Sequence, residues 1–383
     1  MRIGIDARFY GGEQSKGLGR YTQKLIEHLA AYDHTNEYVV FLQQDGFNAW
    51  NIPNNNFTPV LAPYRWYTFR EQLLMPLKIR AANVDLMHFP HFNVPLLYGW
   101  LRPFIVTVHD LIILHFPTER ATTLGPLLYT IKHLAGKLVM RHAVKQARHI
   151  LTVSEFSKQD IMSYYHLPAE KIQVTYEAAE PVSAHLTAAE ITKVLEKYDI
   201  SKPYLLYVGN VYPHKNLEVV IDLLAELKKR GTPPLWHIVL VGREDYFYKR
   251  LKAEARAKNI DEYIVFTDFV PDDELPALYT NAQAYIFPSH YEGFGLPALE
   301  AMSYGTPVLA ARSSCLPEIL GDAALYFDPN DISGIINAVE RIMNDEHLRA
   351  HLIQASTTQL RQYSWKTMMQ RTWQIYQDAI HDK

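Results

Sequence analysis

The sequence predicts an α/β protein with two doubly wound domains of parallel strands. Short apolar runs alternate with amphipathic segments throughout the 383 residues, a pattern typical of strand–helix units around parallel sheets. The chain is also longer than a single core usually fills, which favours two domains of roughly 180 residues each. A polar stretch over residues 176–203 contains Pro181 and separates two runs of this alternation. We therefore expect one domain over residues 1–180 and a second over residues 181–364.

Six apolar runs in the first domain have the length and composition of strands. They are residues 3–6, 39–42, 85–88, 104–109, 150–153 and 172–175. The amphipathic segments between them predict helices over residues 20–32 and 155–165, and a long helix within residues 126–146. Ser154 stands immediately before the helix at 155–165, where its hydroxyl is expected to cap the helix N-terminus.

The second domain repeats the pattern with six further strand candidates. They are residues 204–208, 238–241, 264–266, 284–287, 308–310 and 325–327. A surface helix is expected over residues 186–198, and from residue 331 onward the pattern is helical, with a last helix over residues 365–380. Open α/β sheets bind ligands at the carboxyl ends of their strands, so we expect functional residues directly after these strands.

The composition argues against several classes of protein. The 38 basic and 41 acidic residues give a net charge of −3, which disfavours nucleic acid as a main partner. A single cysteine, Cys315, excludes an internal disulfide framework and fits a reducing cytosol. Asp6 and Arg8 interrupt the first apolar run, so we expect no signal peptide, and no window has the apolar length of a membrane span. We expect a cytoplasmic protein.

The most informative stretch follows the strand at 284–287 and reads SHYEGFGLPALE. Glycines on both sides of Phe294 let the backbone approach a ligand, and Pro297 marks the first turn of a helix whose N–H groups favour an anion. Glu292 lies at the mouth of this site, and Glu300 lies one turn into the helix. Two carboxylates beside a phosphate site indicate a ligand that is also rich in hydroxyls, such as a nucleotide sugar. Tight packing and the helix dipole would explain the same residues without a ligand.

Three other segments follow strands. Lys215 comes after the strand at 204–208 and a Gly-Asn turn, where its ammonium is expected to meet an anion, although most lysines are simply solvated. His109 stands beside Asp110 at the end of a strand, and a buried structural role would explain it equally. The loop GGEQSKGLGR enters the first helix and is either a phosphate loop or an ordinary surface loop, because its glycine spacing is not that of a dinucleotide site.

No Asp-x-Asp pair follows a strand, so we expect neither a metal ion nor any other cofactor. The charge of a departing phosphate would then be stabilised by Lys215 and the helix dipole. The segment FVPDDEL, residues 269–275, has acidic residues at a helix start, and its backbone could read the edge of a nucleobase.

The chain resembles glycosyltransferase family 4, the retaining enzymes with two facing Rossmann-like domains known as the GT-B fold. The resemblance covers nearly the whole chain and rests on five segments, which read GLGRY, VTVHDL, LTVSEFSKQDI, YVGNVYPHKN and FPSHYEGFGLPALEAMSYGTPVL. The last contains the Glu-x7-Glu signature of the family as Glu292 and Glu300. The resemblance also implies that a C-terminal helix, residues 365–383, crosses back to the first domain. It further implies that the first domain binds the acceptor and the second domain binds the donor.

The resemblance implies catalytic roles for three residues. His109 would line the reaction centre beneath the transferred sugar, Lys215 would neutralise the diphosphate, and Glu292 would contact sugar hydroxyls. Glu300 would hold the ribose. The remaining donor-binding residues that we expect are Gly17, Gly19, Asn210, Val270, Phe294, Gly295 and Leu296.

The sequence departs from the family pattern in its basic residues. Many members carry arginine where this chain has Asn210, and often arginine where it has His214, so neutralisation of the diphosphate is expected to rest on Lys215. We expect transfer of a hexose with retention to a hydroxyl of a glycan or a lipid-linked acceptor. GDP-mannose is the first candidate donor and UDP-glucose the second.

Other functions stay open on the sequence. One alternative is a sugar-nucleotide epimerase of the same architecture, which should lack the Glu-x7-Glu loop. Another is a non-catalytic partner protein, which would explain the missing arginine. A dehydrogenase is disfavoured because the glycine fingerprint of a dinucleotide site is absent. Residues 64–80 and 124–149 mix apolar and basic side chains, which suits peripheral contact with the inner face of a membrane or an ordinary solvated helix.

Overall fold

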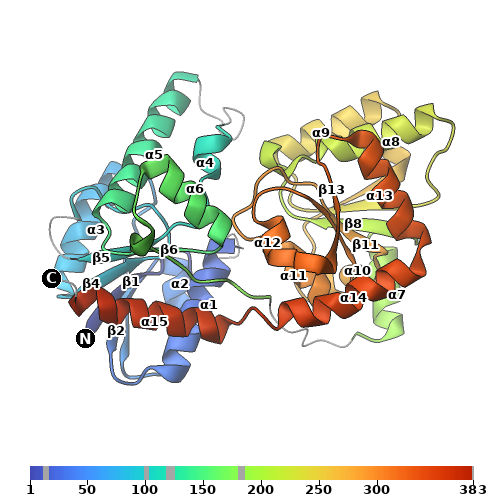
Figure 1. The fold of residues 1–383 in the computed structure, drawn as a ribbon. Coiled ribbons are helices and arrows are strands. Elements are labelled where there is room, and N and C mark those ends of the chain that lie inside the picture. The colour runs from blue at the N-terminus through green and yellow to red at the C-terminus, as the bar shows by residue number, and fades with distance from the viewer. Residues whose placement is uncertain (12–16, 99–102, 118–125, 180–185, 382–383) are drawn as a thin grey trace. The chain divides into compact units, whose positions relative to one another are not determined.

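The computed structural model describes residues 1–11, 17–98, 103–117, 126–179 and 186–381 (Figure 1). The chain forms two compact units. Unit 1 contains Met1–Pro117, Leu124–Glu177 and Ser364–Lys383, and unit 2 consists chiefly of Ala178–Tyr363. Each unit has its own parallel sheet with helices on both faces, so the predicted α/β class with two Rossmann-like domains is confirmed.

The sheet of unit 1 has the strand order β3-β2-β1-β4-β5-β6-β7 and is parallel throughout. The order reverses between β1 and β4, which is the position where doubly wound sheets bind ligands. The strands are β1 (Arg2–Asp6), β2 (Glu37–Leu42), β3 (Phe57–Leu61), β4 (Leu86–Phe89), β5 (Phe104–Thr107), β6 (Ile150–Thr152) and β7 (Ile172–Val174).

The helices of unit 1 cover this sheet, and four of them were expected from the sequence. They are α1 (Gly17–Tyr32), α2 (Gln44–Asn48), α3 (Phe69–Ala81), α4 (Ile112–His115), α5 (Pro126–Gln146), α6 (Glu155–Tyr165) and α15 (Trp365–His381). The predicted cap of α6 is present, because the hydroxyl of Ser154 accepts a hydrogen bond from the backbone N–H of Ser157 at 3.1 Å.

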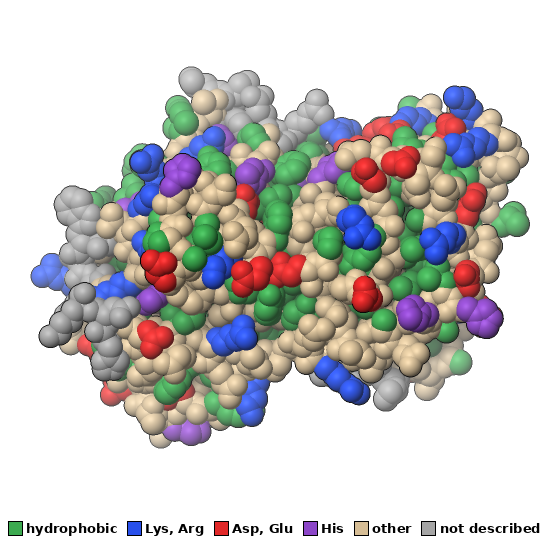
Figure 2. Space-filling model, in the orientation of Figure 1, with side chains coloured by type: hydrophobic (Ala, Val, Ile, Leu, Met, Phe, Trp, Pro, Cys, Tyr) green, Lys and Arg blue, Asp and Glu red, His purple; other side chains and the backbone are tan. Residues whose placement is uncertain are grey.

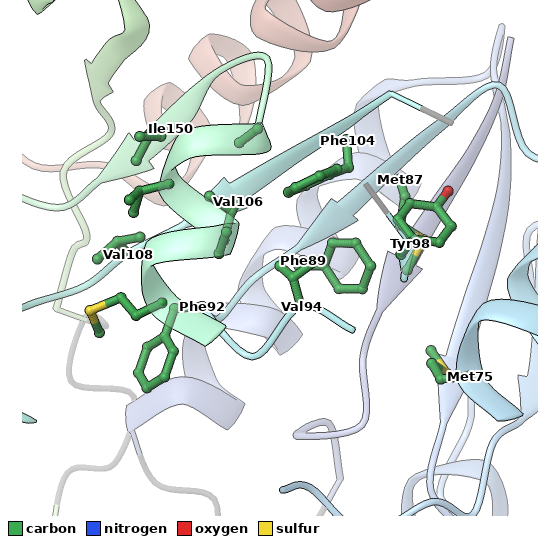
Figure 3. Close-up of a cluster of buried hydrophobic side chains, with 14 of the residues drawn as sticks. Met75, Met87, Phe89, Phe92, Val94, Tyr98, Phe104, Val106, Val108 and Ile150 are labelled. Atoms are coloured by element: carbon green, nitrogen blue, oxygen red, sulfur yellow. The ribbon is translucent and has the colours of Figure 1, made fainter. Parts of the chain in front are cut away.

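One core cluster joins α3 and α5 to the central strands. Met75 of α3 and Met140 of α5 belong to it together with β-strand residues that are fully buried (Figure 3). The rings of Phe89, Tyr98 and Phe104 meet edge to face, with centroids 5.5 to 6.1 Å apart. Since both helices contribute to a single cluster, they cover the same face of the sheet.

Two expectations for unit 1 need correction. Strand β3 was not predicted, because Pro59 interrupts its apolar run; β3 lies at the edge of the sheet, where a missing N–H is tolerated. Helix α1 begins at Gly17 and not at Arg20, so Gly17 and Gly19 lie in its first turn rather than in the preceding loop.

The sheet of unit 2 is also parallel, with the order β10-β9-β8-β11-β12-β13. Its strands are β8 (Tyr204–Val208), β9 (His237–Val241), β10 (Ile264–Asp268), β11 (Ala284–Phe287), β12 (Val308–Ala311) and β13 (Ala324–Phe327). Its helices are α7 (Ala188–Lys197), α8 (Glu218–Lys229), α9 (Tyr246–Ala257), α10 (Leu275–Asn281), α11 (Leu296–Ser303), α12 (Leu316–Leu320), α13 (Ile332–Asn344) and α14 (Glu346–Leu360).

Helix α15 follows unit 2 in the chain but packs in unit 1, against α1 and β4, as the family resemblance implied. The hydroxyl of Tyr376 lies 2.8 Å from Nδ1 of His88, and the indole N–H of Trp373 donates to Asp33 at 2.9 Å. Among the described residues, no helix combines the length and the apolar character needed to cross a membrane.

Candidate functional site

The loop between β11 and α11 places a helix N-terminus at the carboxyl edge of the unit 2 sheet. Gly295 precedes α11 with a left-handed φ of 96°, and a Cβ atom there would come within 3.1 Å of Leu316 and 3.3 Å of Phe287. Glycine is therefore required at this position. Pro297 lies in the first turn, as predicted, and the N–H groups at the start of such a helix lack intrahelical acceptors.

An ion pair lies beside this helix start. The ammonium of Lys215 is 2.7 and 2.8 Å from the two carboxylate oxygens of Glu292, and both side chains are largely buried. The backbone N–H of Glu292 donates to the hydroxyl of Ser314 at 3.0 Å, which fixes the loop that carries the carboxylate. Lys215 and Glu292, which follow different strands and were predicted to belong to one donor site, are thus in contact.

Lys215 does not lie at the start of α8. Lys215 ends a short 3₁₀ helix, Pro213–Lys215, and α8 begins only at Glu218. Asn216 between them adopts a left-handed φ of 56°, and its amide donates to the carbonyls of Pro288 and Pro329 at 3.2 Å. These bonds tie the loops that follow β8, β11 and β13 to one another.

His214 does not supply a second positive charge. Burial lowers the pKa of His214 to about 3, and the neighbouring ammonium of Lys215 acts in the same direction. The imidazole is therefore neutral at physiological pH. The cationic charge at this point of the loop therefore comes from Lys215.

A crevice of about 500 Å³ opens at the same edge of unit 2, next to the ion pair. A hydrogen bond links this crevice to the loop that carries Lys215. The backbone N–H of His290, which lines the crevice, donates to the carbonyl of His214 at 2.8 Å. Arg312 lies over the ring of Tyr326 at 4.7 Å on another wall. The crevice is lined by His290, Arg312, Ser313, Tyr326, Phe327, Asp328, Pro329 and Asn330.

The other predicted donor residues differ in their accessibility. Asn210 is exposed, whereas the side chains of Val270 and Phe294 are buried, so only the backbone of these two could serve a ligand. The ring of Phe294 packs edge to face on Tyr363, with centroids 5.6 Å apart. Glu300 is half-buried in α11.

In unit 1, His109 follows β5 and is held through both ring nitrogens. Its Nδ1 lies 3.1 Å from a carboxylate oxygen of Glu177, and its Nε2 lies 3.0 Å from the carbonyl oxygen of Pro90. Both partners only accept hydrogen bonds, so both ring nitrogens must carry a proton. Burial alone would lower the pKa of His109, but the hydrogen bond and charge of Glu177 outweigh it and raise that pKa above its usual value.

Two other histidines lie close enough to His109 to be affected by its charge. Burial lowers the pKa of His88 and of His91 to about 3, and the charge of His109 contributes to both shifts. Tyr21 packs edge to face on the His109 ring at 4.8 Å, and burial raises the pKa of Tyr21 to about 12. Of these three histidines only His109 has a raised pKa, and the carboxylates of Glu177 and Asp110 both act in that direction.

Sequence reasoning missed Glu177 and Ser314. Glu177 comes three residues after β7, so the rule that functional side chains follow strands would have found it. Ser314 gives no comparable signal, since its role depends on a left-handed backbone with φ of 48° and on one hydrogen bond.

The chain is similar to curated bacterial proteins over most of its length. It is 29% identical to the O-antigen chain mannosyltransferase B of Escherichia coli, over 94% of this chain and 95% of that protein. It is 27% identical to the O-antigen chain mannosyltransferase RfbU of Salmonella typhimurium, over 86% of this chain and 88% of that protein.

Solved structures share the fold. The sucrose-phosphate synthase of Thermosynechococcus elongatus superposes with a TM-score of 0.74 at 19% identity, covering 100% of both chains. Anabaena HepE, solved in complex with UDP and glucose, gives a TM-score of 0.72 at 18% identity, covering 98% of this chain and 99% of that one.

Two family models match consecutive parts of the chain. The model described as Glycosyltransferase Family 4 matches residues 15–180, and the model described as Glycosyl transferases group 1 matches residues 190–359. Together they leave only short segments unmatched. The chain therefore belongs to the family 4 glycosyltransferases and has their GT-B fold of two Rossmann-like domains.

Proposed function

We propose that this glycosyltransferase moves mannose from GDP-mannose to a hydroxyl of a glycan or lipid-linked acceptor, with retention at the anomeric carbon. The mannosyl donor is supported by two relatives named O-antigen chain mannosyltransferases, which align with this chain over most of their lengths. Unit 2 is the proposed donor domain and unit 1 the proposed acceptor domain.

The observation that carries the proposal is the Lys215–Glu292 ion pair at the N-terminus of α11. A diphosphate that approaches the helix start would attract the ammonium of Lys215 and release the carboxylate of Glu292. That carboxylate would then accept hydrogen bonds from sugar hydroxyls, and Glu300 would accept them from the ribose. Opening this one ion pair would thus free Lys215 for the diphosphate and Glu292 for the sugar.

The proposed chemistry is a front-face displacement. The acceptor oxygen forms its bond to the anomeric carbon on the side from which the diphosphate leaves, and the leaving phosphate oxygen takes the acceptor proton. Lys215 and the dipole of α11 stabilise the charge that develops on the phosphate. We propose that the reaction needs no metal, on the ground that no Asp-x-Asp pair follows a strand.

Thermal stabilisation by a panel of nucleotide sugars tests the donor. A ligand at about 100 times its dissociation constant adds roughly 2.7 kcal/mol of stability, so the true donor should give the largest rise in melting temperature. We expect GDP-mannose to exceed UDP-glucose; the reverse order would assign the second donor. No shift with any nucleotide would favour a non-catalytic protein.

Product analysis tests the reaction itself. We expect an α-linked product from the α-linked donor, read by NMR of the anomeric proton, and unchanged turnover after addition of EDTA. Conversion of the nucleotide sugar without any acceptor would indicate an epimerase instead.

The proposed location is the cytoplasm, at the inner face of the membrane. Support comes from the cysteine content, because a chain with the single cysteine Cys315 has no internal disulfide of the kind that many secreted proteins contain. Contact with a membrane would bring the enzyme to a lipid-linked acceptor.

A further inference from the structure

Helix α3 exposes a line of large apolar side chains. Phe69, Leu73 and Leu77 are 92%, 59% and 61% exposed and are spaced four residues apart, so they lie along one face. The buried residues Met75 and Ile79 lie on the opposite face. This outer face is therefore apolar without being packed against any part of the described chain.

Helix α5 has a second line of the same kind. Ile131, Leu134 and Leu138 are 55%, 60% and 57% exposed, with the three- and four-residue spacing of one helix face. The opposite face buries Met140 and Val144 in the cluster that also holds Met75 and Ile79 of α3. Both apolar lines thus point away from the same side of the unit 1 sheet.

The charges on these two helices are of one sign. Helices α3 and α5 contain seven basic residues and one acidic residue, whereas the whole chain has 38 basic and 41 acidic residues. The one acidic residue, Glu71, is fully buried and paired with Arg8 at 2.7 Å, so it contributes no negative charge to the surface. The basic residues are Arg70, Lys78, Arg80, Lys132, Lys137, Arg141 and Lys145.

Unit 2 has no comparable surface over its described residues. Its large exposed apolar side chains, such as Leu235 at 92% and Ile353 at 37%, do not recur at helical spacing. In Figure 2, acidic and basic groups are interspersed over this unit, while the upper left, where α5 lies in Figure 1, carries blue, purple and green groups. Scattered apolar residues are ordinary on proteins, but two parallel lines with one-signed charges are not.

We propose that the outer faces of α3 and α5 together form a docking surface for an anionic lipid bilayer. We call it the basic apolar face; it consists of the six exposed apolar residues and the basic residues of the two helices. The apolar side chains enter the boundary between headgroups and acyl chains, and the lysines and arginines reach the lipid phosphates from their flexible stems.

This surface is independent of the proposed donor site, which lies in unit 2 and uses Lys215 and Glu292. It rests on the proposed membrane location and deepens it, because it names the side chains and the lipid charge that would hold the chain at a membrane. A second copy of the chain is the other partner that an apolar face could bind. The basic charges disfavour it, since two such faces would repel each other.

Flotation of the full-length protein with extruded vesicles tests the proposal. We expect binding to vesicles of phosphatidylcholine with phosphatidylglycerol and none to pure phosphatidylcholine. At about 0.5 M NaCl, where charges more than roughly 4 Å apart are screened, binding should fall strongly. Failure to float with anionic vesicles at low salt would overturn the proposal, whatever the protein does with nucleotide sugars.

Two paired variants and a matched control locate the surface. Leu73→Glu with Leu77→Glu on α3, and Leu134→Glu with Leu138→Glu on α5, should each lower the bound fraction at least about tenfold, because carboxylates oppose both apolar insertion and anionic lipid. Leu235→Glu changes a leucine in unit 2 that is more exposed, at 92%, and should leave binding unchanged. Circular dichroism melting verifies that each variant folds.

The outcomes separate the alternatives. Equal losses in the Leu235 control and the paired variants would mean that binding is not located on this face and would overturn the proposal. A dimer in sedimentation velocity that the paired variants dissociate, without vesicle binding by the original chain, would assign the face to a second copy.

Discussion

His109 in unit 1 and His214 in unit 2 are histidines in loops that follow parallel strands, yet their pKa values shift in opposite directions. His109 is held protonated between Glu177 and Pro90, while burial lowers the pKa of His214 to about 3 beside Lys215. Burial acts in the same direction on both rings. The difference arises from the neighbour, a carboxylate in one case and an ammonium in the other.

This contrast teaches where positive charge is available in each unit. In unit 2 the loop after β8 presents a lysine and a neutral imidazole, so a bound diphosphate would depend on Lys215. In unit 1 the positive charge of His109 is balanced by Glu177. The His109 ring would therefore help to position a ligand but would add little net positive charge.

The largest effect is expected for Lys215→Ala. Turnover should fall at least tens-fold, equivalent to about 2 kcal/mol or more of transition-state stabilisation, because the neutral His214 cannot replace the lost charge. Initial rates with saturating donor measure the loss. Lys215→Arg is the matched control and should retain part of the activity; near-normal turnover in the alanine variant would remove the assigned role.

The next effect is expected for Gly295→Ala. The left-handed φ of 96° and the close approach to Leu316 and Phe287 should cost about 1–3 kcal/mol of unfolding free energy. Urea unfolding measures the change. Stability equal to that of the original chain would show that the α11 loop relaxes freely, and would contradict a rigid helix start at the donor site.

A smaller effect, dependent on pH, is expected for Glu177→Gln. Because the folded-state pKa of His109 is raised, its stabilisation is complete below about pH 6.5 and is lost as pH rises through the folded-state value. The variant should lose about 1 kcal/mol at pH 6 and show less dependence on pH above that point. Urea unfolding at several pH values, with the imidazole followed by NMR, distinguishes this from a general loss of packing.

The smallest effect is expected for Gly17→Ala. A Cβ atom at Gly17 has no neighbour within 4 Å, and the residue lies in the first turn of α1, so stability should rise by up to about 1 kcal/mol. If Gly17 closes over donor phosphates as the family resemblance implies, activity should fall while stability rises. A rise in stability with full activity would mean that Gly17 acts only as a residue of α1 and has no part in donor binding.

Most of the fold was predictable because buried parallel strands are short apolar runs with clear ends. The strand at residues 204–208 and the helix at residues 155–165 were predicted with their observed bounds. Strand β3 was missed because Pro59 argues against a central strand, and the sequence does not tell which strand lies at an edge.

The candidate site was predictable only in part. Lys215 and Glu292 were predicted for one donor site because both follow strands of one sheet, but the ion pair that they form was not predicted. The charge states of His109 and His214 were not predictable, since they depend on Glu177 and on burial, which only the fold determines.

Helix α15 gives unit 1 an unusual order of assembly. The ribosome completes every strand of unit 1 long before it synthesises residues 365–381, and all of unit 2 emerges in between. Until then Tyr376 is missing beside His88, and the partner that α1 packs against does not exist. The first-made half of the molecule is therefore finished last, and nascent unit 1 presents an open apolar surface that chaperones could recognise while the other half folds.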